Sequence, residues 1–329
     1  MLPVRLAGLG SYLPARRVTN AELEDRLSIA PGWIARATGV EERRYAGDES
    51  ALTMGAAAAR AALAAAGLAP NDLDAIVGAA AAPQQAIPCT AVFIARELGL
   101  ADGRAACFDL NATCLSFPFA LHAVAALIAA GVYRTVLIVS SELASRTLNP
   151  NEPESAVLFG DAAAAAIVTR AEPGGASALW GARFVTHPSG AEHTVVRGGG
   201  TLHHPNDPTT TLEDNFFHMD GPRIYRHGAR LIGPFLDRFL ADLGWCRADL
   251  AALVPHQASR HALDLLTERL GFTPAQVVSN IAQRGNCVAA SLPLALAEAV
   301  AAGRIQRGDR VLLGGSGAGL TLGAVGLTY

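Results

Sequence analysis

The chain of 329 residues has no lysine, so its 26 basic residues are all arginines. We interpret this absence as a high-GC coding bias and not as a requirement of the chemistry. With 29 acidic residues the net charge is −3. Such a balance gives no general basic field, so we expect no nucleic acid among the partners.

Cysteine and charged residues are also scarce. The five cysteines are an odd number, and their spacing fits neither a disulfide framework nor a zinc site. Alanine-rich stretches such as 55–66 are broken by glycine and arginine well before the length that a bilayer requires. The first ten residues lack the pattern of a signal peptide. We therefore expect a cytoplasmic protein with no membrane association, no metal and no bound cofactor.

What the chain has in abundance is hydrophobic sequence, which makes up 51% of it and suffices for a large core. The sequence also repeats itself weakly. Residues 67–77 resemble 244–254, residues 96–99 resemble 268–271, and 114–131 can be laid on 286–303. The offset stays at roughly 172 to 177 residues, which indicates a duplication of half the chain and not a solenoid.

Each half alternates strand-like and helix-like patterns, which predicts two α/β halves with mixed sheets and helices between and outside them. We place the boundary near 172–176, giving an N-terminal half of 1–172 and a C-terminal half of 173–329. Residues 197–215, rich in Gly, His, Pro and Thr, are predicted to form a surface loop. The predicted strands are 74–81, 104–110, 135–141, 250–255 and 310–315, and the predicted helices are 52–66, 115–130 and 259–270.

Cys114 is predicted to lie at a strand-to-helix junction, between the strand 104–110 and the helix 115–130. Unpaired N–H groups at a helix start favour a thiolate and can hold an oxyanion, so we expect a lowered pKa and a nucleophile. The alternative is a small buried hydrophobe, the usual role of a free cysteine. In the repeat alignment Cys114 falls on Asn286, which predicts that two related helix starts converge on one site.

Two further polar residues follow predicted strands or loops. His256 comes directly after the strand 250–255, where its imidazole can serve as a base or a hydrogen-bond donor, although a structural histidine is the commoner case. Asn286 alone would be a turn or capping residue. The glycine-rich run 312–323 is expected to form a loop whose amides approach a ligand, and it is not a dinucleotide fingerprint because no helix follows it.

These motifs, taken in order, resemble the β-ketoacyl-acyl carrier protein synthase III family of thiolase-like condensing enzymes. The resemblance extends over nearly the whole chain. It rests on the runs 8–14, 33–34, 38–40 with Arg43, the Cys114 junction, 159–161, 254–258, 285–286 with 289–293, and 319–323. It implies a duplicated α-β-α-β-α layered fold with two mixed sheets.

The resemblance also implies a catalytic set of Cys114, His256 and Asn286. Cys114 would accept an acyl group, and the other two would bind the carbonyl of a malonyl thioester during decarboxylation. The condensation intermediate would rest on the amides of Cys114 and Gly319. On the substrate side the resemblance places Trp33, Ile87, Phe159 and Ser259, with Ile87 in a segment that crosses a homodimer.

Two related enzyme types fit less well. Thiolases use a second cysteine in their C-terminal glycine loop, and residues 314–319 contain none. The chain is also shorter than the chalcone synthase type. Condensation is therefore favoured over thiolysis, with coenzyme A or phosphopantetheine thioesters as substrates.

The chain departs from the family pattern where the donor is expected. Ala37 stands where the family has an arginine near the coenzyme A adenine, and Ser259 where it has an asparagine. A second family arginine is replaced near 152–154. The other departures from the family pattern are the run 160–164, which reads Gly-Asp-Ala-Ala-Ala, the residues Leu115 and Ser116 after Cys114, and Cys287 after Asn286. We hypothesise that the donor is not acetyl-coenzyme A and arrives on an acyl carrier protein. Arg223, Arg226 and Arg230, at helical spacing, form a predicted docking face; a merely solvated face is the alternative.

Two other functions stay open at this point. The Cys-bound acyl group could pass to a hydroxyl or amine without decarboxylation, as in a simple acyltransferase. The chain could also be a non-catalytic partner of another ketosynthase, although the retained cysteine, histidine and asparagine argue against this.

Overall fold

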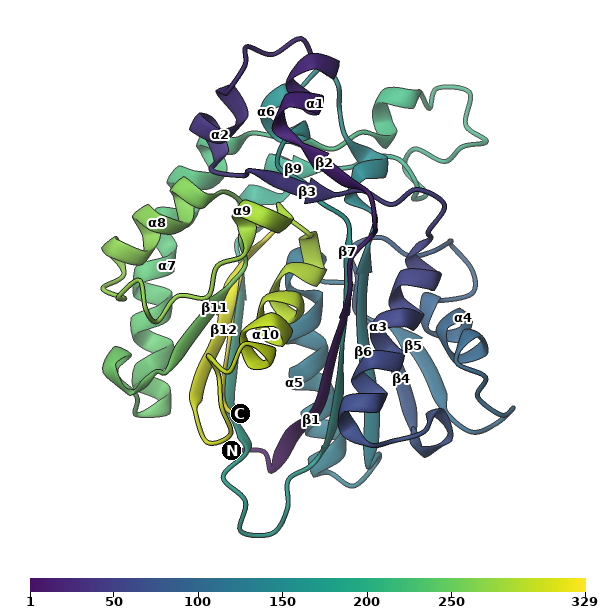
Figure 1. Cartoon of the computed structure of the whole chain (residues 1–329), viewed down its shortest axis with the longest axis vertical. Helices are drawn as coiled ribbons and strands as arrows, with labels where there is room; N and C mark the ends of the chain where they lie inside the picture. The colour runs from purple at the N-terminus through teal and green to yellow at the C-terminus, as the bar shows by residue number, and fades with distance from the viewer.

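Two mixed β-sheets form the centre of the molecule, with helices between them and on both outer sides (Figure 1). The computed structural model describes residues 1–329, apart from the side chain of Leu266. The order of layers is helix, sheet, helix, sheet, helix. The layered architecture predicted for the chain is confirmed.

The first sheet has the strand order β1-β7-β6-β4-β5. Strand β4 is parallel to β5 and β6, whereas β7 is antiparallel to β1 and β6. The strands are β1 (Val4–Tyr12), β4 (Ala75–Gly78), β5 (Ala106–Asp109), β6 (Thr135–Glu142) and β7 (Ala162–Arg170). Helices α3 (Ala51–Ala66) and α4 (Thr90–Glu97) cover its outer face.

The second sheet has the order β11-β12-β13-β8, with β11 and β12 parallel and the other pairs antiparallel. Its strands are β8 (Ala178–Thr186), β11 (Ala252–Pro255), β12 (Arg310–Gly317) and β13 (Thr321–Thr328). Helices α7 (Gly221–Leu243) and α8 (Arg260–Arg269) lie on its outer side (Figure 1).

The middle layer consists of α5 (Ser116–Ala129) and α10 (Ser291–Ala301), each of which contacts strands of both sheets. A helix buried on two sides must be apolar nearly all round, and both sequences are. Their leucines, valines and alanines join the inner faces of the two sheets in one hydrophobic cluster. This shared core fixes the starts of α5 and α10 relative to each other.

Short elements cap the upper end of the layers in Figure 1. They are β2 (Arg17–Thr19), α1 (Asn20–Arg26), α2 (Trp33–Thr38), β3 (Glu42–Arg44), α6 (Pro153–Ala156), β9 (Thr194–Val195), β10 (His218–Met219) and α9 (Ile281–Arg284). The predicted loop 197–215 runs among them and is largely exposed, with one short 3₁₀ turn at Leu212–Asn215.

The sequence repeat reappears as a structural one. Gly67 and Gly244 end α3 and α7 in the left-handed conformation, and each is followed by a 3₁₀ turn and a parallel strand, β4 or β11. The proposed boundary falls in the connection between β7 and β8. That 1–172 and 173–329 are separate domains stays a prediction.

The glycine-rich run at the C-terminus differs from the prediction. It is not a loop after a strand, because β12 continues through Gly317 and pairs with β13 over its full length. One of these glycines has a packing reason. Gly315 lies against His256, and a Cβ at Gly315 would come within 2.7 Å of the His256 Cβ.

Gly10 is the clearest point at which packing demands glycine. A Cβ at Gly10 would lie 2.3 Å from the Ala58 oxygen and 2.4 Å from the Ala62 nitrogen of α3. We predict that Gly10→Ala lowers the free energy of unfolding by about 1–3 kcal/mol, because β1 must move away from α3. Urea denaturation measures this change.

The matched control is Gly228→Ala in α7, where a Cβ meets nothing within 4 Å. Alanine favours a helix interior over glycine by about 1 kcal/mol, so this variant should be as stable as the natural chain or more so. Equal stability losses in both variants would contradict the packing argument.

Candidate active site

One cavity of about 1290 Å³ opens between the two halves, and Cys114, His256 and Asn286 all line it. They come from a 3₁₀ turn before α5, from the residue after β11 and from the loop before α10. The structure thus brings together three side chains that are far apart in the sequence. Their catalytic roles stay a prediction.

The turn that carries Cys114 has an unusual backbone. Thr113 has φ +53°, a conformation rarely adopted by residues other than glycine. Two side-chain bonds hold it: the Thr113 N–H donates to Asn111 Oδ1 at 2.8 Å, and the Ala112 N–H donates to Ser116 Oγ at 2.9 Å. These bonds compensate for the strain and fix Cys114 at the start of α5.

The turn that follows Asn286 is built in the same way. Val288 has φ +49°, its N–H donates to Asn286 Oδ1 at 2.9 Å, and the Cys287 N–H donates to Ser291 Oγ at 3.0 Å. Because Oδ1 is engaged, the Nδ2 hydrogens of Asn286 are the part available to a ligand.

This match corrects the predicted alignment of Cys114 with Asn286. By backbone conformation and hydrogen bonds, Asn286 corresponds to Asn111 and not to Cys114. The distance in sequence between the two helix starts is therefore three residues greater than that between the two helix ends. The reason is that α10 has 11 residues and α5 has 14. The ends, at Gly131 and Gly303, agree with the original offset.

Burial sets the protonation state of His256. The backbone N–H of His256 donates to the Gly314 oxygen of β12 at 2.8 Å, which places the residue at the carboxyl end of β11. Among the described residues, none bonds to its Nδ1. Desolvation lowers the pKa of His256 to about 4, so the imidazole is neutral at neutral pH and can accept a proton.

The expected lowering of the Cys114 pKa is wrong. Burial raises the pKa of the Cys114 thiol to about 12, and the Glu142 carboxylate adds to the rise. The N–H groups of Ala318 and of Cys114 itself act in the opposite direction but do not outweigh desolvation. The Cys114 thiol is therefore neutral at neutral pH and would need a base to act as a nucleophile.

Glu142, at the end of β6, is a residue of this cavity that the sequence reasoning missed. Burial raises the pKa of its carboxyl to about 8, against the N–H groups of Ala81, Ala289 and Ala82. The Ala81 N–H donates to Glu142 Oε1 at 2.6 Å. An acidic residue at the end of a buried strand with an apolar centre is the signal that could have identified it. Ala318 was also missed, because nothing in a glycine-rich run indicates which amide faces the sulfur.

The remaining predicted residues are placed as follows. Trp33, Phe159, Ser259 and Gly319 line the cavity, and Phe159 packs edge-to-face against Phe217 with ring centroids 4.8 Å apart. Ile87 does not line this chain's cavity, since its side chain is 82% exposed. The predicted docking residues Arg223, Arg226 and Arg230 are exposed near the start of α7.

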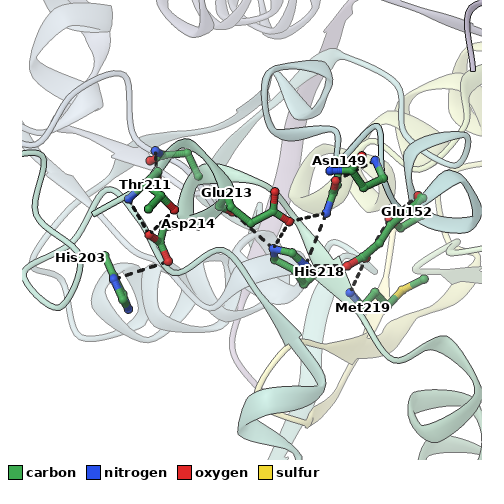
Figure 2. A network of polar contacts seen from close by, with 11 residues as sticks. Asn149, Glu152, His203, Thr211, Glu213, Asp214, His218 and Met219 are labelled. Atoms are coloured by element: carbon green, nitrogen blue, oxygen red, sulfur yellow. Dashed lines mark hydrogen bonds and ion pairs between the residues drawn. The ribbon is translucent and has the colours of Figure 1, made fainter. Parts of the chain in front are cut away.

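A polar network ties the loop 197–217 to the segment before α6 (Figure 2). His218 Nδ1 lies 2.5 Å from Glu152 Oε1, and its Nε2 lies 3.5 Å from Glu213 Oε1. Hydrogen bonding to Glu152 is the main cause that raises the pKa of His218. Asn149 donates to Glu213 at 3.3 Å. The neighbouring Phe217 and Met219 line the cavity, so this network positions part of its wall.

The layered, duplicated fold and the cavity between its halves define a thiolase-like condensing enzyme, that is, an enzyme of the acyl-transferring kind. Residues 108–185 match the family described as 3-oxoacyl-[acyl-carrier-protein (ACP)] synthase III, and residues 240–329 match its C-terminal family. The chain belongs to the 3-oxoacyl-[acyl-carrier-protein] synthase III family.

Individual relatives agree with this assignment. The chain is 39% identical over 326 residues to β-ketoacyl-[acyl-carrier-protein] synthase III 3 of Streptomyces coelicolor, covering 98% of this chain and 96% of that one. It is similar to the crystal structure of 3-oxoacyl-(acyl carrier protein) synthase III from Pseudomonas aeruginosa, with TM-score 0.89, 35% identity and coverage of 99% and 98%. A priming β-ketosynthase of a polyketide biosynthetic pathway has TM-score 0.89, 33% identity and coverage of 98% and 95%.

The family expected from the sequence is confirmed, and with it an enzyme of the condensing, acyl-transferring kind. No helix among the described residues has both the length and the hydropathy to cross a membrane.

The raised pKa of Cys114 predicts how its alkylation depends on pH. Well below a pKa of about 12, the thiolate fraction of a thiol rises tenfold per pH unit. The logarithm of the rate of reaction with iodoacetamide, plotted against pH, should therefore rise with a slope of one from pH 7 to 10. Peptide mass spectrometry measures the rate at this residue. A plateau below pH 8 would contradict the raised pKa.

Glu142→Gln tests the cause of part of this shift. Above pH 8 the natural side chain is largely ionised and opposes the thiolate, so the variant should react faster than the natural protein at pH 9 to 10. Near pH 6, where Glu142 is protonated, the two should react at similar rates. Glu154→Gln, a change in another acidic residue of the same cavity, is the control.

Proposed function

We propose that Cys114, His256 and Asn286 carry out the family reaction in this chain. The support is that the three side chains line one largely apolar cavity and that burial keeps the first two uncharged. A neutral thiol and a neutral imidazole that line the same cavity can exchange a proton without leaving a buried charge unpaired.

Acylation is the first step. The Cys114 thiol gives its proton to the His256 imidazole, and its sulfur attacks the carbonyl of the acyl thioester. The bond from that carbonyl to the donor sulfur breaks, and the leaving thiolate takes the proton from His256. The amides of Cys114 and Gly319 are the proposed donors to the transient oxyanion. The Ala318 N–H, which contacts the sulfur, stabilises the attacking thiolate.

Condensation follows when a malonyl thioester enters. The imidazole N–H of His256 and the Nδ2 of Asn286 donate to its thioester carbonyl. The bond to the carboxylate breaks, CO₂ leaves, and the electron pair remains as an enolate. The enolate carbon attacks the acyl-Cys114 carbonyl, the C–S bond breaks, and the released thiolate of Cys114 takes up a proton from bulk water. The two hydrogen bonds to the enolate oxygen, made in a site without water, lower the barrier to decarboxylation.

The test combines intact-protein mass spectrometry with measurement of CO₂ release from labelled malonyl thioester. Cys114→Ala should lose acylation, whereas Cys246→Ala, which alters an exposed cysteine, should keep it. Asn286→Ala should still be acylated but release CO₂ about 10²- to 10³-fold more slowly, with the exposed Asn206→Ala as control.

The outcomes separate the remaining functions. Transfer of the acyl group to a hydroxyl or amine without CO₂ release would identify a simple acyltransferase. A protein that never acquires an acyl group and yet alters the products of another ketosynthase would identify a non-catalytic partner. Unchanged CO₂ release in Asn286→Ala would contradict the role given to this residue.

We also propose an acyl carrier protein as the donor, in preference to acetyl-coenzyme A. Glu152, in the stretch where the resemblance implies a cationic contact to coenzyme A, is committed to His218. The exposed Arg223, Arg226 and Arg230 offer positive charge beside the cavity residues Gly221 and Ile224. A cytoplasmic homodimer, in which Ile87 reaches the partner's cavity, completes the proposal.

Charge reversal distinguishes docking from catalysis. Changing all three arginines to glutamate should lower kcat/KM by roughly tenfold with an acyl carrier protein at low salt. It should not change turnover of the same acyl group on free pantetheine. Arg269→Glu, at an exposed site on α8, is the control. Efficient self-acylation by acetyl-coenzyme A, or an equal loss with both donors, would overturn the carrier proposal.

A further inference from the structure

The cavity has a part that the reaction steps above do not use. It extends under α7 and α8, along the outer face of the second sheet. Six buried residues of one hydrophobic cluster define this part, which we call the apolar arm: Leu236, Leu253, Leu263, Leu312, Leu322 and Ala324.

The arm and Cys114 belong to the same cavity. Gly317 of β12 lies against the turn of Cys114, since a Cβ there would come within 2.9 Å of the Thr113 Oγ1. Ser316, the preceding residue, belongs to the opposite, outer face of the sheet and pairs with Leu322; the pairs Gly314–Ala324 and Leu312–Gly326 follow on that outer face. The four residue-to-residue steps from Ser316 to Leu312 span about 13 Å of strand.

The far end of the arm is closed. At Gly326, the partner of Leu312, a Cβ would lie 2.6 Å from the Leu243 Cδ1 and 3.2 Å from the Trp245 ring. These two side chains therefore form a packed floor. The arm has a defined length, comparable with that of an extended decanoyl to dodecanoyl chain.

Small residues at two facing positions, Gly228 of α7 and Ala262 of α8, help to leave this space open. Along one face of α7, Ile224, Gly228 and Ile232 recur at a spacing of four and line the cavity, with Gly228 facing open space. Ala262 of α8 lines it from the other side. Larger residues at these positions would close the gap between helices and sheet.

The chemistry of the arm selects a hydrocarbon. Its six defining side chains offer no hydrogen-bonding group. The hydroxyl of Thr267, at its edge, already donates to the Leu263 oxygen at 2.7 Å. The amides of a phosphopantetheine would be left unpaired here, which is costly. An apolar cavity stays dry and takes an apolar ligand.

We propose that the apolar arm binds the tail of a medium- to long-chain aliphatic acyl group held as a thioester on Cys114. The proposal rests on the proposed function and adds its substrate class. It assigns the tail to the outer face of the second sheet and not to the smaller group of side chains around Phe159 and Phe217, which the resemblance implies as the acyl pocket.

The experiment loads the protein with hexanoyl- and dodecanoyl-pantetheine and measures each acylation rate by intact mass. We expect the dodecanoyl chain to load faster, because each further buried methylene favours binding by about fourfold. Ala324→Leu, which fills the arm, should lower the dodecanoyl-to-hexanoyl ratio by about tenfold or more. Ala262→Phe repeats the test from the α8 side and covers the case in which Ala324→Leu folds poorly.

Two controls locate the effect. Ala241→Leu makes the same change at an exposed site on α7 and should leave the ratio unchanged. Ala144→Leu fills the space beside Phe159 and should also leave it unchanged if the tail lies in the arm.

The failures are distinguishable. Loading of hexanoyl but not of dodecanoyl chains would overturn the arm and leave the proposed function intact. A ratio lowered by Ala144→Leu and not by the arm variants would place the tail beside Phe159. If no acyl group reaches Cys114 from either thioester, the proposed function itself fails.

Discussion

The site depends on one backbone constraint, which is the positive φ of Thr113 and Val288 at the starts of the two central helices. Such conformations cost about 1–3 kcal/mol each and persist where neighbouring bonds enforce them. Here the enforcing groups are the side chains of Asn111 and Asn286, each accepting the N–H of the strained residue. Because α5 and α10 are packed between the same two sheets, the two turns face one cavity.

Burial determines the charge of what this constraint brings together. The same desolvation that raises the pKa of the Cys114 thiol and the Glu142 carboxyl lowers that of the His256 imidazole. All three groups are therefore held mainly in their uncharged forms at neutral pH. An uncharged site admits an acyl chain at little electrostatic cost, and charge develops only when a substrate carbonyl reaches the donors. A permanently ionised cysteine would need a compensating cation in the cavity; Arg146, which also lines it, donates to the Gly47 oxygen.

The sequence predicts the layers well because they follow from hydrophobic patterning. Helix 52–66 and strand 135–141 were placed within one residue of α3 and β6. It predicts the convergence of Cys114, His256 and Asn286 through the repeat and the family resemblance. It does not predict the sign of the Cys114 shift, because proximity to a helix start is visible in a sequence whereas depth of burial is not. The alignment of Cys114 with Asn286 in the repeat is wrong for a similar reason. Glycines mark the helix ends in the sequence, but nothing in it marks the three-residue difference in helix length.

The duplication explains why an asparagine is available as the third member of the proposed site. Both halves carry an asparagine that holds the strained turn through Oδ1, so this residue is first a structural requirement of the fold. In the first half, Asn111 Nδ2 donates to the Ala81 oxygen at 2.8 Å and is thereby occupied. In the second half, the hydrogen bonds found for the Asn286 side chain among the described residues involve Oδ1, which leaves its Nδ2 for a ligand. A side chain that the fold already orients through one end needs no further positioning at the other. The donor is therefore preorganised by the same bond that stabilises the turn.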